Sequence, residues 1–250
     1  MADLTHLQSL LDSEATSLHV PGAAVGVLFD GAEHVLTTGV TSVDAPAPVT
    51  ADTLFQIGST TKTVTATVIM HLIEEGRLDL DGRVRKYLPE FRLADESAAR
   101  EVTIRHLLTH TGGFLGDIDD GESWGDDALA EAIKVYERLP QLFAPGTLAS
   151  YSNAGFRLLG RVIEVVCGEP YESVVERVVL QPLGMRDSFF FPWVADRRRR
   201  RPLLLCLDIP DGRIAGRDAP GGGHGPHVPQ AEGCRWVRKS AIGSLWPKMA

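Results

Sequence analysis

Ser59 and Lys62 are the first residues in this 250-residue chain whose types and spacing could do chemistry. They lie in a stretch, residues 53–76, that turns at Gly58 and continues with apolar residues at helical spacing as far as Gly76. Because residues three apart share a helix face, the hydroxyl and the amine can approach each other. A helix N-terminus favours negative charge on a nearby oxygen, and a desolvated amine can accept the proton of the serine. The pair is therefore a candidate nucleophile and proton acceptor.

Tyr151 and Asn153 form a second candidate pair, which follows the turn Pro145-Gly146. A tyrosine hydroxyl beside Lys62 could carry the proton between nucleophile and leaving group. An asparagine amide can donate to a substrate carbonyl and accept from a lysine. Both pairs also have a simple structural interpretation. A serine can cap a helix beside a solvated lysine, and a tyrosine can pack half-buried next to a helix cap.

The elements that must position these residues follow from the hydrophobic pattern. We expect an amphipathic helix over residues 3–18, and two strands over 23–29 and 34–40 that the turn Asp30-Gly31 joins. The first strand is nearly all apolar, which predicts that both of its faces are covered. Thr103 is the expected cap of a short helix that stops at residues 111–113. Further helices are expected over residues 128–139, 154–166 and 169–180.

The composition is that of an ordinary globular protein, with 44% hydrophobic and 23% charged residues, but the charge is divided unevenly. Residues 1–190 hold 14 Lys+Arg and 28 Asp+Glu, a net charge of −14, whereas residues 191–250 hold 11 and 5, a net charge of +6. The last segment also includes five consecutive arginines, Arg197 to Arg201, and many Gly and Pro residues. This shift predicts a domain over residues 1–191 and an irregular tail over residues 192–250.

Several classes of site and location are disfavoured. The three cysteines are scattered, which argues against a disulfide framework or a zinc site. His106 and His110 have metal-ligand spacing, but without a nearby carboxylate or cysteine pattern we expect no metal and a local structural role.

No secretory signal and no run of membrane-spanning length is visible, so the cytoplasm is the expected location. We expect no cofactor, no nucleic acid and no membrane partner, and the oligomeric state is not readable.

Four segments, taken together and in order, resemble the serine β-lactamase and penicillin-binding-protein superfamily. They are L-F-Q-I-G-S-T-T-K, V-T-I-R-H-L-L-T-H-T-G-G, A-P-G-T-L-A-S-Y-S-N-A-G-F-R-L-L-G and V-L-Q-P-L-G-M-R-D-S-F-F. The Tyr-x-Asn element points to the branch of class C β-lactamases, D-Ala-D-Ala carboxypeptidases and related esterases, and the resemblance covers residues 5–191. It implies that Ser59 is the nucleophile, Lys62 its proton acceptor, Tyr151 the acid/base partner and Asn153 a substrate-positioning donor. The Ser59 N–H would form one half of the oxyanion hole.

The chain departs from this family after residue 191. Members carry a third motif, Lys-Thr-Gly or His-x-Gly, on a later strand of the sheet, and residues 192–250 contain neither. His224-Gly225-Pro226 is the nearest approach. We therefore expect an α/β (α+β) fold of the β-lactamase/transpeptidase-like type, with an antiparallel sheet and a helical lobe but without its C-terminal strands. A shifted reading frame or a truncation would explain the tail.

Three functional hypotheses follow. The first is a serine hydrolase that forms an acyl-enzyme at Ser59 with a small ester, β-lactam or D-amino-acid peptide, with weak activity because the third motif is absent. The second is an inactive family remnant or binding module in which Ser59 only caps a helix. The third is an arginine-rich protein that binds a partner through its tail, which the acidic character of the other residues disfavours.

Overall fold

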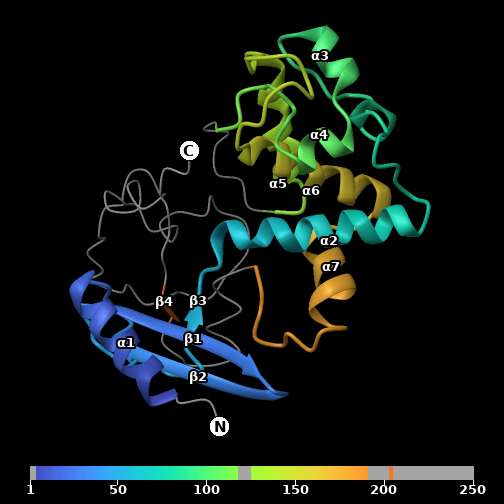
Figure 1. Cartoon of the computed structure of the whole chain (residues 1–250). Helices are drawn as coiled ribbons and strands as arrows, with labels where there is room; N and C mark the ends of the chain where they lie inside the picture. The colour runs from blue at the N-terminus through green and yellow to red at the C-terminus, as the bar shows by residue number, and fades with distance from the viewer. Residues whose placement is uncertain (1–3, 118–124, 191–202, 205–250) are drawn as a thin grey trace, which may run out of the picture. The chain divides into compact units, whose positions relative to one another are not determined.

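The computed structural model describes residues 4–117, 125–190 and 203–204 (Figure 1). The chain divides into two compact units, residues 1–56 with 192–250 and residues 57–191. The predicted tail, including its arginine run and His224-Gly225-Pro226, lies outside the described residues except for positions 203–204. The division of the chain at residue 191 and the missing C-terminal strands therefore stay predictions.

The first unit contains one helix and an antiparallel hairpin. Helix α1 (Leu4–Ser17) precedes strands β1 (Gly22–Phe29) and β2 (Ala32–Gly39), which pair in register from Gly22 opposite Gly39 to Phe29 opposite Ala32. Asp30 and Gly31 both have left-handed φ angles of 50° and 75°. Two such residues make the turn whose twist matches that of paired strands. The predicted helix, strands and turn are confirmed.

The expected coverage of β1 on both faces is wrong. Leu28 and Phe29 near its end are 74% and 55% exposed, and Val25 is 39% exposed. Apolar composition alone does not separate a doubly covered strand from one with an open face, because burial depends on which elements pack against the sheet. The unit also holds a two-residue parallel pair, in which Leu54 and Phe55 of β3 (Leu54–Phe55) face Leu203 and Leu204 of β4 (Leu203–Leu204).

In the described residues of the second unit the regular elements are helices, joined by loops that include two isolated β-bridges, Arg83 with Thr103 and Phe114 with Gln141. Its α-helices are α2 (Thr61–Glu74), α3 (Glu96–Glu101), α4 (Ile104–Leu108), α5 (Ala128–Ala132), α6 (Asn153–Cys167) and α7 (Tyr171–Val175). Four short helical turns complete it, at Gly58–Thr60, Val84–Lys86, Ile133–Arg138 and Glu176–Leu180. The largest fully buried side chains are Tyr136, Phe91, Ile69, Leu72, Leu88, Ile104, Leu107, Leu158, Leu159 and Ile163.

Helix α6 runs through the centre of this core. Leu158, Leu159 and Val162 on it are completely buried. The Ser152 hydroxyl caps its start by accepting from the Gly155 N–H at 2.9 Å, and Gly168 ends it with a left-handed φ of 73°. A hydroxyl cap and a C-terminal glycine are the expected helix boundaries. The predicted helix over 154–166 is therefore confirmed, one residue longer at each end.

Helix α2 packs against α6 and α7 (Figure 1). The hydroxyls of Thr65 on α2 and Tyr171 on α7 are hydrogen bonded at 2.7 Å, which attaches the two helices at a largely buried point. The chain enters α2 through a 3₁₀ turn that begins at Gly58, with a left-handed φ of 50°, and leaves it at Gly76, with a φ of 71°. Both glycines stand where the sequence predicts a change of direction.

Two predicted helices are shorter or more irregular than expected. The segment 128–139 begins as α5 but tightens into a 3₁₀ turn after Ala132. The segment 169–180 begins two residues later, at Tyr171 after Pro170, and widens into a π turn over Glu176–Leu180. Such adjustments within a helical stretch arise from packing against neighbouring helices, which the sequence period does not encode.

An ion-pair cluster holds α3 to the turn Val84–Lys86. Arg85 donates two hydrogen bonds to Glu96, Nη1 to Oε1 at 2.7 Å and Nη2 to Oε2 at 2.6 Å, and Arg100 Nε donates to Oε1 at 3.1 Å. The hydrogen bonds from Arg85, and to a lesser extent Arg100, lower the pKa of Glu96 from 4.5 to about 2. Glu96 therefore stays ionised well into the acid range.

This cluster predicts an acid-dependent part of the stability. Because the pKa of Glu96 is depressed in the folded state, the contribution of Glu96 to the stability of the fold is full above about pH 4.5. This contribution is lost as the pH falls towards about 2. In Glu96→Gln we expect a melting temperature that is lower near neutral pH and converges with that of the unmodified protein near pH 2. Thermal unfolding across this range, with the exposed Glu90→Gln as control, measures it. Equal offsets for Glu96→Gln at all pH values would contradict the assignment.

Candidate active site

Ser59 lies in the turn Gly58–Thr60 and Lys62 in the first turn of α2, as their spacing predicts. Lys62 Nζ donates to Ser59 Oγ at 3.4 Å. The cap positions of the two helical segments belong to Ile57 and Thr60, and neither makes a side-chain cap hydrogen bond. The simple interpretation of Ser59 as a helix cap therefore does not describe its position. Its hydroxyl points instead to other polar groups.

Tyr151 joins this pair from a segment 92 residues further along the chain. Its hydroxyl donates to Ser59 Oγ at 2.8 Å, and Lys62 Nζ lies 4.8 Å from the centre of its ring. Burial raises the pKa of the Tyr151 hydroxyl, but interaction with Lys62 and Ser59 together outweighs burial, so its pKa lies below 10.0. An ammonium close to a tyrosine favours the phenolate form. Tyr151 thus has the geometry and the shifted pKa of a proton carrier.

Asn153, the first residue of α6, completes the cluster. Its Oδ1 accepts from Lys62 Nζ at 2.8 Å, and its Nδ2 donates to Asp117 Oδ1 at 3.1 Å. An ammonium on one side and a carboxylate on the other determine which way the amide faces. One N–H of the amide remains for a further acceptor, such as a substrate carbonyl. The structure thus brings all four predicted site residues together.

Asp117 is the site residue that sequence reasoning missed. It belongs to the acidic, Gly-rich segment 116–125, whose only sequence signal is that of a surface loop. The contact arises because Gly116 lies directly against the start of α6, where its carbonyl accepts from the N–H groups of Asn153 and Ala154. A Cβ on Gly116 would come within 2.6 Å of the Ser152 Cα. Only a glycine permits this approach.

The two histidines with metal-ligand spacing make separate contacts. His106 Nδ1 accepts from the Thr103 N–H at 3.3 Å, and the Thr103 hydroxyl accepts from the His106 N–H, so the pair forms a capping box at the start of α4. His110 Nδ1 accepts from the Ser152 N–H at 3.1 Å. Among the described residues, no group of three His, Cys, Asp or Glu side chains could hold a metal ion.

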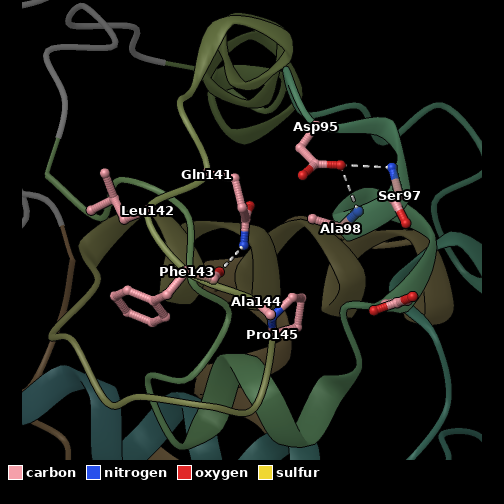
Figure 2. Close-up of a pocket in the computed structure, with 9 residues that line it drawn as sticks. Asp95, Ser97, Ala98, Gln141, Leu142, Phe143, Ala144 and Pro145 are labelled. Carbon is pink, nitrogen blue, oxygen red and sulfur yellow. Dashed lines mark hydrogen bonds between the residues drawn. The ribbon is translucent and has the colours of Figure 1, made fainter.

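A hollow of about 300 Å³ lies elsewhere in the second unit, between residues 95–101 and 141–145 (Figure 2). Asp95 accepts there from the N–H groups of Ser97 and Ala98, and the Gln141 amide donates to the Phe143 carbonyl at 2.7 Å. The Asp95 carboxylate and the Gln141 NH₂ group are thus hydrogen bonded to the backbone, whereas Gln141 Oε1 is buried without a partner among the described residues. The four predicted site residues are not among those that line the hollow.

Comparison with known proteins identifies the family. The family model for Beta-lactamase matches residues 7–225, and the chain belongs to this family. Penicillin-binding protein 4 of Amycolatopsis lactamdurans is 40% identical over 197 residues, which are 79% of this chain and 52% of that protein. Esterase EstB of Burkholderia gladioli is 40% identical over 168 residues, which are 61% of this chain and 42% of that protein.

Solved structures give the same fold class. The D-amino acid amidase from Ochrobactrum anthropi SV3, in complex with L-phenylalanine amide, matches with a TM-score of 0.67 and 25% identity, over 77% of this chain and 56% of that one. The predicted α/β fold of the β-lactamase/transpeptidase-like type is confirmed. The chain spans about half the length of the curated relatives it matches.

In the portion of the chain that the structure describes, none of the helices has the length and apolar character needed to cross a membrane. The cytoplasmic location stays a prediction.

Proposed function

We propose that this protein is a serine hydrolase that forms an acyl-enzyme at Ser59. The observation that carries the proposal is the convergence on Ser59 Oγ of the Tyr151 hydroxyl at 2.8 Å and Lys62 Nζ at 3.4 Å. A nucleophile within reach of a base that a third group orients is the arrangement that activates serine hydroxyls. Here the orienting group is Asn153, which holds Lys62 at 2.8 Å.

The proposed acylation step moves one proton and exchanges one bond. As Ser59 Oγ bonds to the acyl carbon, its proton passes to the basic pair formed by Lys62 and Tyr151, and the carbonyl electrons move to oxygen. The Ser59 N–H donates to this oxyanion. When the carbonyl re-forms, the bond to the leaving group breaks, and the leaving alkoxide or amine takes its proton from Tyr151. Water then attacks the acyl-serine by the same proton path in reverse.

The proposed substrate class is a small ester, β-lactam, or D-amino-acid peptide or amide. The names of the relatives support this range, since they include a penicillin-binding protein, an esterase and a D-amino acid amidase. Asn153 would position the substrate carbonyl with its remaining N–H. All of these substrates present a carbonyl carbon to the same nucleophile, so one site can serve the whole class.

Covalent labelling of the intact chain tests the proposal. We expect a gain of one adduct in intact mass after incubation with a fluorophosphonate, and with benzylpenicillin if β-lactams are accepted. Fragmentation of the labelled peptide should assign the adduct to Ser59 rather than to the neighbouring Thr60 or Thr61. No adduct on a folded, monomeric sample would reject the hydrolase and favour the inactive remnant. Acylation without turnover of p-nitrophenyl esters would support the acylation step and reject the hydrolysis of the acyl-enzyme.

The lowered pKa of Tyr151 predicts a pH dependence. If the phenolate form takes part in accepting the proton, the labelling rate constant should rise with pH and reach half its maximum below pH 10.0, the ordinary pKa of tyrosine. In Tyr151→Phe we expect a loss of about 10²–10⁴-fold in rate and disappearance of this rise. Fluorophosphonate labelling at several pH values, corrected for reagent hydrolysis, measures both. A Phe variant that keeps the same pH profile would remove Tyr151 from the proton path.

A further inference from the structure

His110 contacts the chain on both sides of Tyr151. Its backbone carbonyl accepts from the Ser150 N–H at 2.8 Å, and its Nδ1 accepts from the Ser152 N–H at 3.1 Å. The residues immediately before and after Tyr151 are therefore both hydrogen bonded to a single residue. This pattern fixes the backbone from which the Tyr151 side chain projects.

The ring of His110 contacts the ring of Tyr151 as well. The two ring centroids are 4.7 Å apart, and the ring planes are tilted by 36°. The ring of Phe156, which lies on α6, is centred 5.1 Å from that of His110. Aromatic rings at such separations attract each other beyond the burial of their surface. Lys62 Nζ lies near the same rings, 4.8 Å from the centre of Tyr151 and 5.7 Å from that of Phe156.

The backbone of His110 has an unusual conformation that these contacts require. Its φ is 58°, in the left-handed region. Residues other than glycine seldom adopt this region, and they keep it only where surrounding contacts hold them there. His110 follows α4 by two residues, and the left-handed turn directs the chain towards the segment that carries Tyr151.

We propose that His110 is a positioning residue that holds Tyr151 against Ser59 and Lys62. The effect of His110 on the reaction rests on the proposed function. The role itself goes beyond that function, because none of the hydrogen bonds of His110 described above reaches Ser59. The imidazole acts on the reaction through Tyr151, by holding the backbone that follows it at Ser152 and by contacting the tyrosine ring.

The protonation state of His110 agrees with this role. Because Nδ1 accepts a backbone N–H, the ring proton resides on Nε2 in the neutral form. Burial first, and the positive charge of Lys62 second, lower the pKa of His110 below 6.5, so the ring is neutral at neutral pH. Within the described ranges, the charged and titratable groups beside the His110 ring are Lys62 and Tyr151 itself. A neutral imidazole can accept from Ser152 without adding a second cation beside Lys62.

The chain offers a matched control in His106. This histidine also accepts a backbone N–H through Nδ1, but from Thr103, at the opposite end of α4. Replacing it removes the same type of hydrogen bond at Thr103 and leaves the hydrogen bonds of Ser150 and Ser152 to His110 in place, although His106 lines the same small hollow as these two serines. His106→Ala should therefore lower stability while leaving the chemistry of the labelled site unchanged.

The test compares His110→Ala, His110→Asn and His106→Ala in the full chain. Fluorophosphonate concentration is varied so that the maximal labelling rate and the half-saturating concentration are obtained separately. In His110→Ala we expect the maximal rate to fall about tenfold or more, as for the loss of one well-placed interaction, with the half-saturating concentration within about twofold. Asparagine tolerates the left-handed region and its Oδ1 can accept from Ser152. His110→Asn should therefore recover part of the rate.

A second readout does not depend on activity. Amide hydrogen exchange at Ser152 should accelerate in His110→Ala, less in His110→Asn, and not in His106→Ala, whereas the Ser150 N–H donates to the His110 backbone carbonyl and keeps this acceptor in all three variants. Unchanged exchange at the Ser152 amide in His110→Ala would overturn the proposed contact. A maximal labelling rate in His110→Ala equal to that of the unmodified protein would overturn its role in positioning Tyr151. If the unmodified protein takes no label, the proposed function fails, and the exchange data alone decide whether His110 holds the segment.

Discussion

Ser59→Ala is expected to abolish covalent labelling and to lower hydrolysis of an activated ester by at least about 10⁴-fold. The physical reason is that Ser59 Oγ is the one atom on which Tyr151 and Lys62 both converge. Removing the hydroxyl leaves these groups without the proton that they would transfer. The fold should be unaffected, because the hydroxyl makes no helix-cap hydrogen bond.

The matched control is Thr60→Ala in the same turn. The Thr60 side chain makes no cap hydrogen bond to α2, so its loss should change neither labelling nor the melting temperature appreciably. Intact mass and circular dichroism of both variants measure the effect. Labelling that persists in folded Ser59→Ala would place the nucleophile elsewhere, and loss of labelling in both variants would indicate damage to the turn rather than to the chemistry.

Leu158→Ala is expected to lower the free energy of unfolding by about 2–5 kcal/mol. Leu158 lies on α6 with 0% of its surface exposed, within a core that α2, α4 and α7 share. Truncation removes buried methyl groups and leaves a cavity that close-packed neighbours cannot fill. Because α6 begins at Asn153, loosening this helix should also lower the labelling rate before the protein unfolds globally.

Leu183→Ala makes the same chemical change at a site that is 69% exposed. We expect this substitution to lower the free energy of unfolding by less than about 0.5 kcal/mol, as for most surface substitutions. Urea unfolding of both variants, followed by the helical signal in circular dichroism, measures the difference. Similar losses from the two leucines would show that the packing around α6 does not dominate the stability of this unit.

Local patterns predicted much of the helical unit and the N-terminal hairpin. Gly58, Gly76 and Gly168 stand where the chain turns, Thr103 caps α4, and Asp30-Gly31 joins the strands. These features depend on backbone conformations that particular residue types favour, so they can be read without knowing what lies across the core. The exposed face of β1 and the irregular ends of α5 and α7 were not predicted, because packing partners decide them.

For the candidate site, the sequence by itself determined the pair Ser59 and Lys62, because a separation of three residues on one helical turn is a local property. It also determined the family, through four segments whose order and residues are specific together. Only the tertiary structure decided that Tyr151 reaches Ser59 from 92 residues away and that Asp117 orients Asn153. It likewise decided that His110 holds the backbone on both sides of Tyr151. Contacts between segments so distant in the chain arise from core packing and from the close approach that Gly116 allows, and neither has a periodic signature in the sequence.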